Sequence, residues 1–361
     1  MADTLDKFTR SVKAFYEEIT TTLTAGKTGI DRFLFPVEDL DERDSFALDK
    51  LVKNIHGVVF RKPGEQSVVR PYEPGVGNVY KPPRVSEKTP ITEDLRDSVI
   101  VGLEATDSFS SQTARLLEQI LKQHSAAHTA TRWKLAIDTI RTGKFTPVGM
   151  GGHDIGLEID FSRDGSCSIT YDFTDSGKSI NTALKALYDA KQGSKGNLVM
   201  ILGAKWLQEF SDDETVQAYM QANVANTVLL QSVMPAELQN VQGLYVAAVY
   251  RIPGTLTPVT ICGFQTDEQF VQYADATAVD FMPDDEAICF SAGATRYRVF
   301  RGVDVAEENA IRRAVGEIVF DSFTEKDPPT LYLRSQARYA MIPANVNHTA
   351  RSVGTFPAES A

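Results

Sequence analysis

The sequence has few cysteines and no long apolar run, so it does not have the pattern of a disulfide-rich or membrane protein. Only three of its 361 residues are cysteines, and Cys167, Cys262 and Cys289 lack metal-site spacing. We expect them to be reduced thiols in a cytosolic product. No apolar run approaches the ~18 residues that a membrane helix needs, and the polar start MADTLDKFTR predicts no signal peptide. No membrane partner is therefore expected.

The chain also lacks the excess of basic over acidic residues that a dedicated nucleic-acid binder carries. Its 37 Lys and Arg residues stand against 48 Asp and Glu residues, which gives a net charge of -11. An acidic surface repels phosphates, so tight DNA binding is not expected. The hydrophobic fraction of 42% is that of an ordinary globular protein, and the length predicts two or three substructures with sizeable cores.

Motifs of common enzyme classes are missing as well. The sequence contains no GKS or GKT phosphate loop, no GxSxG elbow and no HExxH. Gly75 and Gly77 are not followed by the third glycine of a dinucleotide loop. His124 and His128 have the spacing of a metal pair on a helix, but no third ligand follows, and a structural pair is the alternative. We expect no catalytic residue, no cofactor and no enzyme.

One row of carboxylates leaves a choice between two interpretations. Asp154, Glu158 and Asp160 lie on one face of a predicted strand, where they alternate with apolar residues. Such a row can bind a divalent cation, which would suit a metal-dependent hydrolase. It can equally form a solvated or interfacial face of the strand.

The clearest predicted element is a helix over residues 108–142. Gly102 and Gly143 bracket it, no glycine or proline interrupts it, and Asp107 or Ser108 can cap its first backbone N–H groups. At ~1.5 Å per residue it would be about 50 Å long. This length exceeds the width of a compact domain, so we expect a spine across an elongated one.

Other segments predict strands, further helices and contacts with neighbours. Residues 144–172 predict a long hairpin that turns at RDGS, a mixed α/β region follows, and the last alternating segment is expected to rejoin an earlier sheet. An apolar stripe from Leu5 to Leu23 predicts a helix that packs on its own domain or docks on another chain. The stretch VVRPYEPGVGNVYKPPRV (68–85) is too rigid for a flexible linker and too polar for a core, which predicts a projecting arm.

The order of these features resembles the lambda-like major capsid proteins (the major capsid protein E family) of tailed bacteriophages, which have the Hong Kong 97-type fold. The resemblance runs from about residue 30 to 353. Its motifs are RPYEPGVGNVYKPPRV with ITEDLR, RTGKFTPVG with LEIDFSRD, FMPDDEAICFSAGATRYRVFRG, and LYLRSQARYAMIPANVNHTARSV. It implies an α+β subunit with an N-terminal arm (1–30), an extended loop (58–96), a peripheral domain (31–57, 97–175 and 316–361) and an axial domain (176–315).

The function that this resemblance implies is self-assembly of hexamers and pentamers into the icosahedral shell around packaged double-stranded DNA. The subunit would be assembled in the host cytoplasm and located in the virion. Its partners would be other copies of itself, a scaffolding protein, the portal and a decoration protein, with DNA only in non-specific proximity. We expect intersubunit contacts from the arm residues Arg70, Tyr72, Tyr80, Lys81 and Arg84, with Asp154, Glu158 and Asp160 as acidic counterparts.

Some relatives crosslink an arm lysine to an asparagine, which here would join Lys62 or Lys81 to Asn345 or Asn347. The lambda-like branch relies instead on noncovalent contacts. An encapsulin-like compartment shell, which shares the fold but packages enzymes, is the main alternative function, and the metal-dependent hydrolase is the second.

Overall fold

The computed structural model describes the greater part of the chain, and the sequence predictions for residues 5–23 and 98–104 lie outside the described part. No helix among the described residues is both long enough and apolar enough to span a membrane. The described residues are 29–49, 77–91, 109–147, 157–175, 178–223, 238, 241–264, 269–271, 278–307, 310–326 and 329–357.

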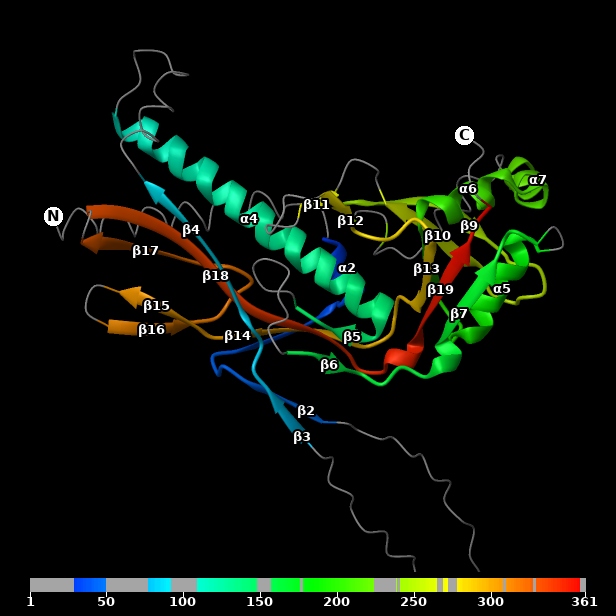
Figure 1. Ribbon diagram of the computed structural model, residues 1–361, viewed down its shortest axis with the longest axis horizontal. Helices are drawn as coiled ribbons and strands as arrows, with labels where there is room; N and C mark the ends of the chain where they lie inside the picture. The colour runs from blue at the N-terminus through cyan, green and yellow to red at the C-terminus, as the bar shows by residue number, and fades with distance from the viewer. Residues whose placement is uncertain are drawn as a thin grey trace, which may run out of the picture.

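The predicted spine helix is confirmed as α4 (Phe109–Thr142). Figure 1 shows it crossing the molecule diagonally, and the short helix α2 (Ile30–Leu34) packs against it. Gly143 ends the helix with a φ of 74°, in the left-handed region that suits glycine. A Cβ at this position would also lie 3.0 Å from Cβ of Arg163, so both conformation and space require glycine.

A five-stranded sheet combines strands from the beginning and the end of the chain. It contains β1 (Val37–Asp41), β4 (Arg84–Ile91), β14 (Arg296–Arg301), β17 (Val319–Lys326) and β18 (Pro329–Pro343). Because β4 and β17 both pair with residues 331–336 of β18, they lie on opposite edges of it. The next part of β18 pairs with β14, and β1 lies parallel to β14. The predicted return of the last segment to an earlier sheet is therefore confirmed.

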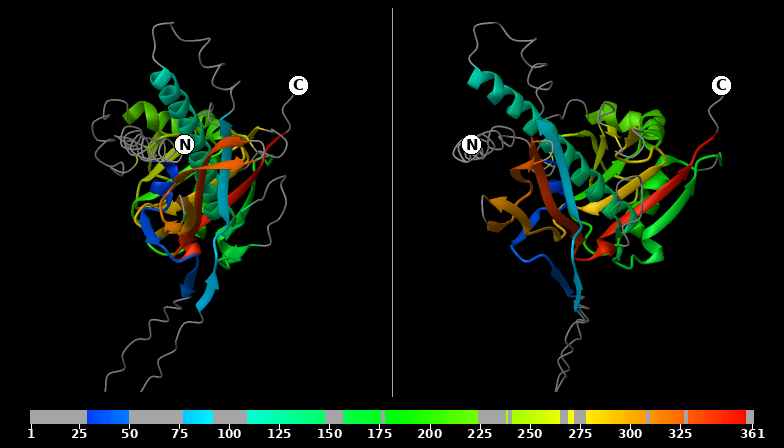
Figure 2. Two further views of the ribbon diagram at one scale, coloured as in Figure 1. Left: turned by 90° about the vertical axis from the view of Figure 1, so that its left-hand side faces the viewer. Right: turned by 60° about the vertical axis from the view of Figure 1, so that its left-hand side comes forward.

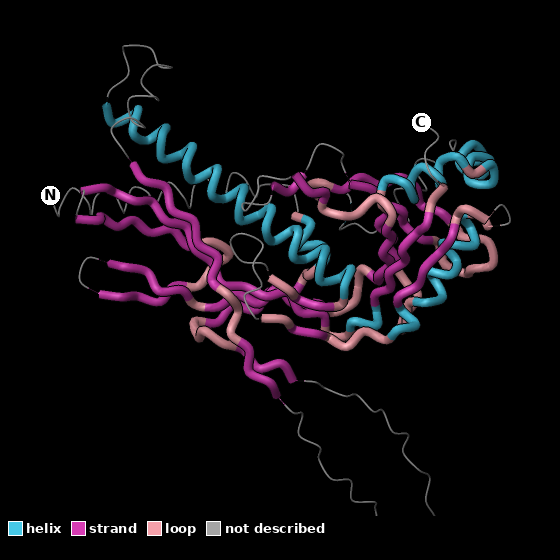
Figure 3. Tube along the Cα trace, in the orientation of Figure 1, coloured by secondary structure: helices cyan, strands magenta, loops and turns pink. Residues whose placement is uncertain are grey.

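A six-stranded sheet has the order β7-β19-β13-β8-β10-β9. Its strands are β7 (Ser168–Asp172), β8 (Leu198–Leu202), β9 (Leu244–Tyr250), β10 (Val259–Phe264), β13 (Glu286–Ser291) and β19 (Thr349–Thr355). Three helices group beside it at one end of the molecule (Figure 3): α5 (Ile180–Ala190), α6 (Ala204–Asp212) and α7 (Glu214–Asn223). The mixed α/β region is thus confirmed.

Both faces of this sheet are buried. Met200 and Cys289 belong to a core with α5, α6 and α7, whereas Ile201 and Ile288 belong to a second core with α2, α4 and the five-stranded sheet. β8 and β13 are buried along their whole length, as expected for central strands covered on two sides.

Four short strand pairs and two single 3-10 turns complete the described elements. The pairs are β2 (Phe46–Asp49) with β3 (Gly77–Tyr80), β5 (Lys144–Phe145) with β6 (Ile159–Asp160), β11 (Gln269–Val271) with β12 (Ala278–Asp280), and β15 (Val303–Glu307) with β16 (Ala310–Ala314). The 3-10 turns are η2 (Gly165–Cys167) and η5 (Val346–His348).

The predicted long hairpin over residues 144–172 is wrong. β6 pairs with β5, but β7 leaves it and joins β19 in the six-stranded sheet as a parallel neighbour. The cause lies in the RDGS stretch, where the Asp164 carboxylate accepts a hydrogen bond from Ser166 N and starts η2 instead of a hairpin turn. The preceding Arg163 side chain reaches back to carbonyls at the end of α4, which directs the chain away from β6.

The sheets cross the boundaries that the family resemblance implies. β7 and β19, from segments assigned to the peripheral domain, lie in the same sheet as β8, β9, β10 and β13 from the axial segment. β14, also from the axial segment, lies in the five-stranded sheet. The division of the chain into an axial and a peripheral domain stays a prediction.

α4 packs on the five-stranded sheet (Figure 2). His124 and His128 of the helix lie at this contact. His124 is hydrogen-bonded through Nε2 to Thr89 Oγ1 of β4 at 2.7 Å, and His128 through Nε2 to Ser335 Oγ of β18 at 3.0 Å. Both rings are buried, and neither Nδ1 atom has a hydrogen-bond partner among the described residues. Burial lowers the pKa of each histidine to about 4, and the Arg132 charge adds to the lowering at His128.

We predict that the two histidines make subunit stability depend on pH. Because their pKa falls from 6.5 in the unfolded chain to about 4 in the fold, their contribution is fully present above pH 6.5. It is lost as the pH falls through about 4, since the unfolded chain then binds more protons. The loss is on the order of 3 kcal/mol per histidine.

Urea unfolding of unassembled subunits at several pH values measures this effect. The variant His124→Gln/His128→Gln keeps polar side chains that do not titrate, so its free energy of unfolding should vary less between pH 7 and pH 4. An unchanged pH dependence in the variant would contradict the assignment.

Candidate functional site

The arm that carries the predicted contact residues joins the folded body through the β2–β3 pair. Phe46 of β2 lies opposite Tyr80 of β3, with ring centroids 6.0 Å apart. The Arg301 guanidinium of β14 lies over the same Phe46 ring, 5.6 Å from its centroid. Aromatic and cation–π contacts therefore fix the base of the arm to the five-stranded sheet.

Lys81 and Arg84 follow Tyr80 at this base. Lys81 Nζ lies 2.6 Å from Asp44 Oδ2, and this hydrogen bond lowers the pKa of Asp44. Arg338 of β18 approaches the same carboxylate oxygen at 4.0 Å. Arg84 is the exposed first residue of β4. The structure thus brings Tyr80, Lys81 and Arg84 together.

The carboxylates Glu158 and Asp160 share one cation of their own chain. Lys144 Nζ lies 2.7 Å from Glu158 Oε1 and 3.2 Å from Asp160 Oδ2, and these hydrogen bonds raise the pKa of Lys144. All three side chains are 41–49% exposed. Glu158 and Asp160 are therefore already paired with a cation of their own chain, and both stay about half-exposed on the β5–β6 surface.

Arg70, Tyr72 and Asp154 lie outside the described residues. Within the described ranges, no group of three or more His, Cys, Asp or Glu side chains is placed to hold a metal ion. Asn345 Oδ1 accepts a hydrogen bond from Asn347 N at 3.0 Å, and Asn347 Oδ1 accepts one from Asp164 N at 2.8 Å. These asparagine side chains therefore stabilise η5 and the loop before η2.

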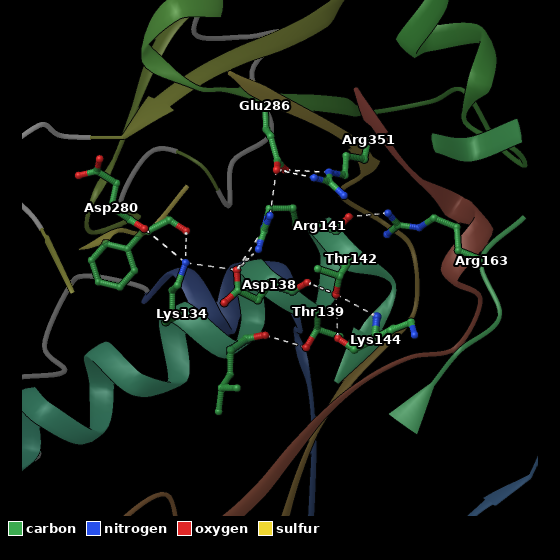
Figure 4. Close-up of polar contacts among 12 residues, drawn as sticks. Lys134, Asp138, Thr139, Arg141, Thr142, Lys144, Arg163, Asp280, Glu286 and Arg351 are labelled. Atoms are coloured by element: carbon green, nitrogen blue, oxygen red, sulfur yellow. Dashed lines mark hydrogen bonds and ion pairs between the residues drawn. The ribbon is translucent and has the colours of Figure 1, made fainter. Parts of the chain in front are cut away.

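The C-terminal end of α4 is held by Arg163, which the sequence analysis did not single out. Its guanidinium donates to the backbone carbonyl of Arg141 at 2.7 Å (Figure 4). It also donates to the carbonyl of Ile140 and to Thr349 Oγ1, 2.8 Å away. Burial lowers the pKa of Arg163 to about 10. A cation at this position neutralises carbonyls that the last helical turn leaves without intrahelical partners.

A second set of ion pairs ties α4 to the six-stranded sheet. Glu286 of β13 accepts hydrogen bonds from Arg141 Nη1 at 2.9 Å and from Arg351 Nε of β19 at 2.8 Å. Figure 4 shows Lys134 and Arg141 converging on Asp138 one turn away, at 3.3 and 3.1 Å. Charge-assisted bonds therefore join the spine helix to two neighbouring strands of this sheet.

A third set is buried between α2, α4 and β14. Asp31 accepts hydrogen bonds from Trp133 Nε1 at 3.1 Å and from Arg132 Nε at 3.2 Å. Arg298 of β14 donates to Glu317 Oε1 at 2.8 Å, and Arg132 lies 3.4 Å from the same carboxylate. Burial alone would raise the pKa of Glu317, but these cations outweigh burial and lower the pKa.

We predict that Glu286 contributes strongly to subunit stability. Glu286→Ala leaves the Arg141 and Arg351 guanidiniums facing each other, and it should lower the free energy of unfolding by about 2–4 kcal/mol. Asp284→Ala, which removes an exposed carboxylate two residues away, is the matched control and should change it by less than about 0.5 kcal/mol. Equal effects of the two substitutions in urea unfolding would show that the ion pairs do not stabilise the fold.

Comparisons with known proteins give the family of the chain. The model of the family described as phage major capsid protein E matches residues 19–353. No curated protein matches the chain.

The solved structures give the fold. A prophage protein of E. coli CFT073, described as a capsid protein, is 14% identical with a TM-score of 0.63, over 96% of this chain and 99% of that one. The mature capsid of bacteriophage PhiM1 matches with 12% identity and a TM-score of 0.43, over 89% and 85% of the two chains. The satellite phage P4 procapsid matches with 8% identity and a TM-score of 0.44, over 95% and 98%.

At identities this low, structural similarity is evidence for the fold only. We base the fold on the prophage protein of E. coli CFT073, because its TM-score exceeds 0.5. The family match covers nearly the whole described body, from α2 to β19. The chain therefore belongs to the phage major capsid protein E family and is a major capsid protein of a tailed bacteriophage, with the Hong Kong 97-type fold.

Proposed function

We propose that this capsid protein assembles noncovalently, as hexamers and pentamers, into an icosahedral shell around packaged double-stranded DNA. In this proposal the extended loop (58–96) of each copy contacts an adjacent copy. The observation that carries it is the fixed base of the arm, where Tyr80 packs on Phe46 and Lys81 pairs with Asp44. A rigidly held base reduces the conformational entropy that the arm loses when it binds a neighbouring copy.

The contact residues of the arm would be Arg70, Tyr72, Tyr80, Lys81 and Arg84. Their acidic counterparts would be Asp154, Glu158 and Asp160 of the adjacent copy. The half-exposed position of Glu158 and Asp160 on the β5–β6 surface supports this pairing, because a neighbouring copy can reach both side chains. Lys81 already pairs with Asp44, so a contact with a neighbour would extend that ion pair into a network.

The remaining parts of the proposal follow from the role of a shell protein. A scaffolding protein and the portal would act during assembly in the host cytoplasm, and a decoration protein would bind the finished shell in the virion. DNA would lie near the inner surface without specific contacts, which suits a chain of net charge -11. The subunit would be structural and not an enzyme. The family match does not favour the encapsulin-like or hydrolase alternatives.

We predict that the purified protein forms closed shells, tubes or sheets that electron micrographs resolve. Arg70→Glu/Tyr72→Ala removes a cation and an aromatic ring from the arm, so it should reduce assembly while the subunit stays folded. Circular dichroism and urea unfolding of the unassembled variant check the fold.

The control is Lys122→Glu, which reverses an exposed charge on α4, outside the arm. Micrographs that show only small particles for the unsubstituted protein would contradict the shell function. Normal shells from the arm variant would contradict only the role given to the arm.

A further inference from the structure

Two buried cations of the chain have no carboxylate partner. The buried Lys and Arg residues of the described part are Arg132, Lys191, Arg296, Arg298 and Arg301. Three of them pair with carboxylates at 2.8–3.2 Å. Lys191 and Arg296, each 1% exposed, contact only neutral oxygen atoms among the described residues. We call these two residues the uncompensated cations, because a buried charge usually has a partner of opposite sign.

Backbone carbonyls connect the uncompensated cations into one group. Lys191 Nζ donates to two carbonyls, one of which is that of Ser194. Arg296 donates to three carbonyls, among them that of Ser291 at 3.0 Å. Ser291 Oγ in turn donates to the Ser194 carbonyl at 2.9 Å. The carbonyls satisfy the donors but bring no net negative charge, so two positive charges stay close together.

The pKa values of both residues reflect this lack of an anion. Burial lowers the pKa of Lys191, and the charges of Lys195 and Arg296 add to the lowering. Burial lowers the pKa of Arg296 to about 10. The charged forms are therefore less favoured here than in water.

The surface over this group is formed by His348, Asn345 and Gly193. The His348 ring is half-buried and lies on Gly193, where a Cβ would be 2.6 Å from His348 Nε2. Asn345 and Gly193 are exposed, and Asn345 Nδ2 lies 3.4 Å from His348 Nε2. Burial lowers the pKa of His348, and the charges of Lys191 and Arg296 add to the lowering. The uncompensated cations therefore act on this surface.

Helix ends and nearby carboxylates compensate only part of the charge. Lys191 is the C-cap of α5, where the helix dipole offsets about half an elementary charge. Arg296 meets the end of α2, but that helix has only five residues. The exposed Asp164 carboxylate contacts the Gln192 amide at 3.3 Å and not a cation. More than one positive charge is left without an anion.

We propose that the surface at His348 and Asn345 binds a phosphate group, which compensates Lys191 and Arg296 beneath it. A phosphate monoester carries a charge of about -1.5 to -2 at pH 7, which matches two cations. The Asn345 amide and the protonated His348 ring supply N–H donors. Free phosphate and the backbone phosphates of DNA share this chemistry. The site does not depend on the proposed shell function.

Calorimetric titration of the full-chain protein with inorganic phosphate, at constant ionic strength in chloride buffer, tests the site. His348→Phe keeps a ring over Gly193 but removes both ring nitrogens. It should weaken phosphate binding about tenfold or more, as expected for the loss of one charge-assisted hydrogen bond. Lys191→Met, which removes a buried charge and keeps an unbranched side chain, should weaken it by a similar factor.

The control for these variants is Lys205→Met, which removes an exposed cation of α6 and should leave phosphate binding unchanged. Urea unfolding in chloride buffer shows which variants fold. Should Lys191→Met fail to fold, the surface variant His348→Phe decides the question alone.

NMR spectra of protein with 13C-labelled histidine locate the bound phosphate. We expect phosphate to shift the ring signals of His348, which are identified by their loss in His348→Phe. The signals of His124 and His128 should stay in place, since both rings are buried where α4 packs on the five-stranded sheet.

A short DNA duplex distinguishes the two sources of phosphate. A duplex that displaces inorganic phosphate from His348 indicates that the site takes backbone phosphates, and a duplex that does not indicates free phosphate. Both results support a phosphate site.

Three results would overturn the proposal. One is the absence of saturable phosphate binding by the unsubstituted protein. Another is binding of equal strength by His348→Phe. The third is binding that leaves the His348 signals unmoved or that Lys205→Met weakens as much as His348→Phe does.

Discussion

The length of α4 is the constraint on which the rest of the structure depends. A helix of 34 residues is about 50 Å long, and no single compact core covers that distance. Two sheets pack along the helix, the five-stranded sheet along its middle and the six-stranded sheet at its C-terminal end. A common core with α2 and the inner face of β8 and β13 joins them. The elongated body of the subunit follows from this arrangement.

Buried charges hold these layers in one register, because apolar packing alone is not directional. Arg298 and Arg132 meet Asp31 and Glu317 between α2, α4 and β14, and Glu286 receives two guanidiniums at the other end of the helix. Removing one partner from such a group leaves an uncompensated charge, which costs more than the group contributes when complete. These ion pairs therefore specify one relative position of helix and sheets.

The sequence predicted the elements whose patterns are local. The spine helix predicted over 108–142 and the mixed α/β region follow from periodicity and from glycine positions. The hairpin at RDGS was predicted wrongly, because the same residues suit a tight turn and a 3-10 start. The contact of Arg163 with the end of α4 favours the 3-10 start, and this contact joins residues that are distant in sequence.

For the predicted site, too, the sequence indicated local features but not contacts between distant segments. Proline, glycine and cation content marked the arm, and Tyr80, Lys81 and Arg84 lie together at its base. The ion pairs of Lys81 with Asp44 and of Lys144 with Glu158 and Asp160 depend on strand pairing that no local pattern gives. The three arginines of RYRVFR (296–301) are buried and donate to backbone carbonyls, and no local pattern in the sequence indicates those contacts.

The pairing of β4 with β18 has a consequence for synthesis in the cell. Ile91 pairs with Leu331, so about 240 residues must be made between one strand and its partner. At roughly 5–20 residues per second, the ribosome needs on the order of 10 to 50 s for that length. The sheet that carries the arm is thus incomplete until the last tenth of the chain emerges. A nascent subunit therefore has no complete five-stranded sheet until its synthesis is nearly finished.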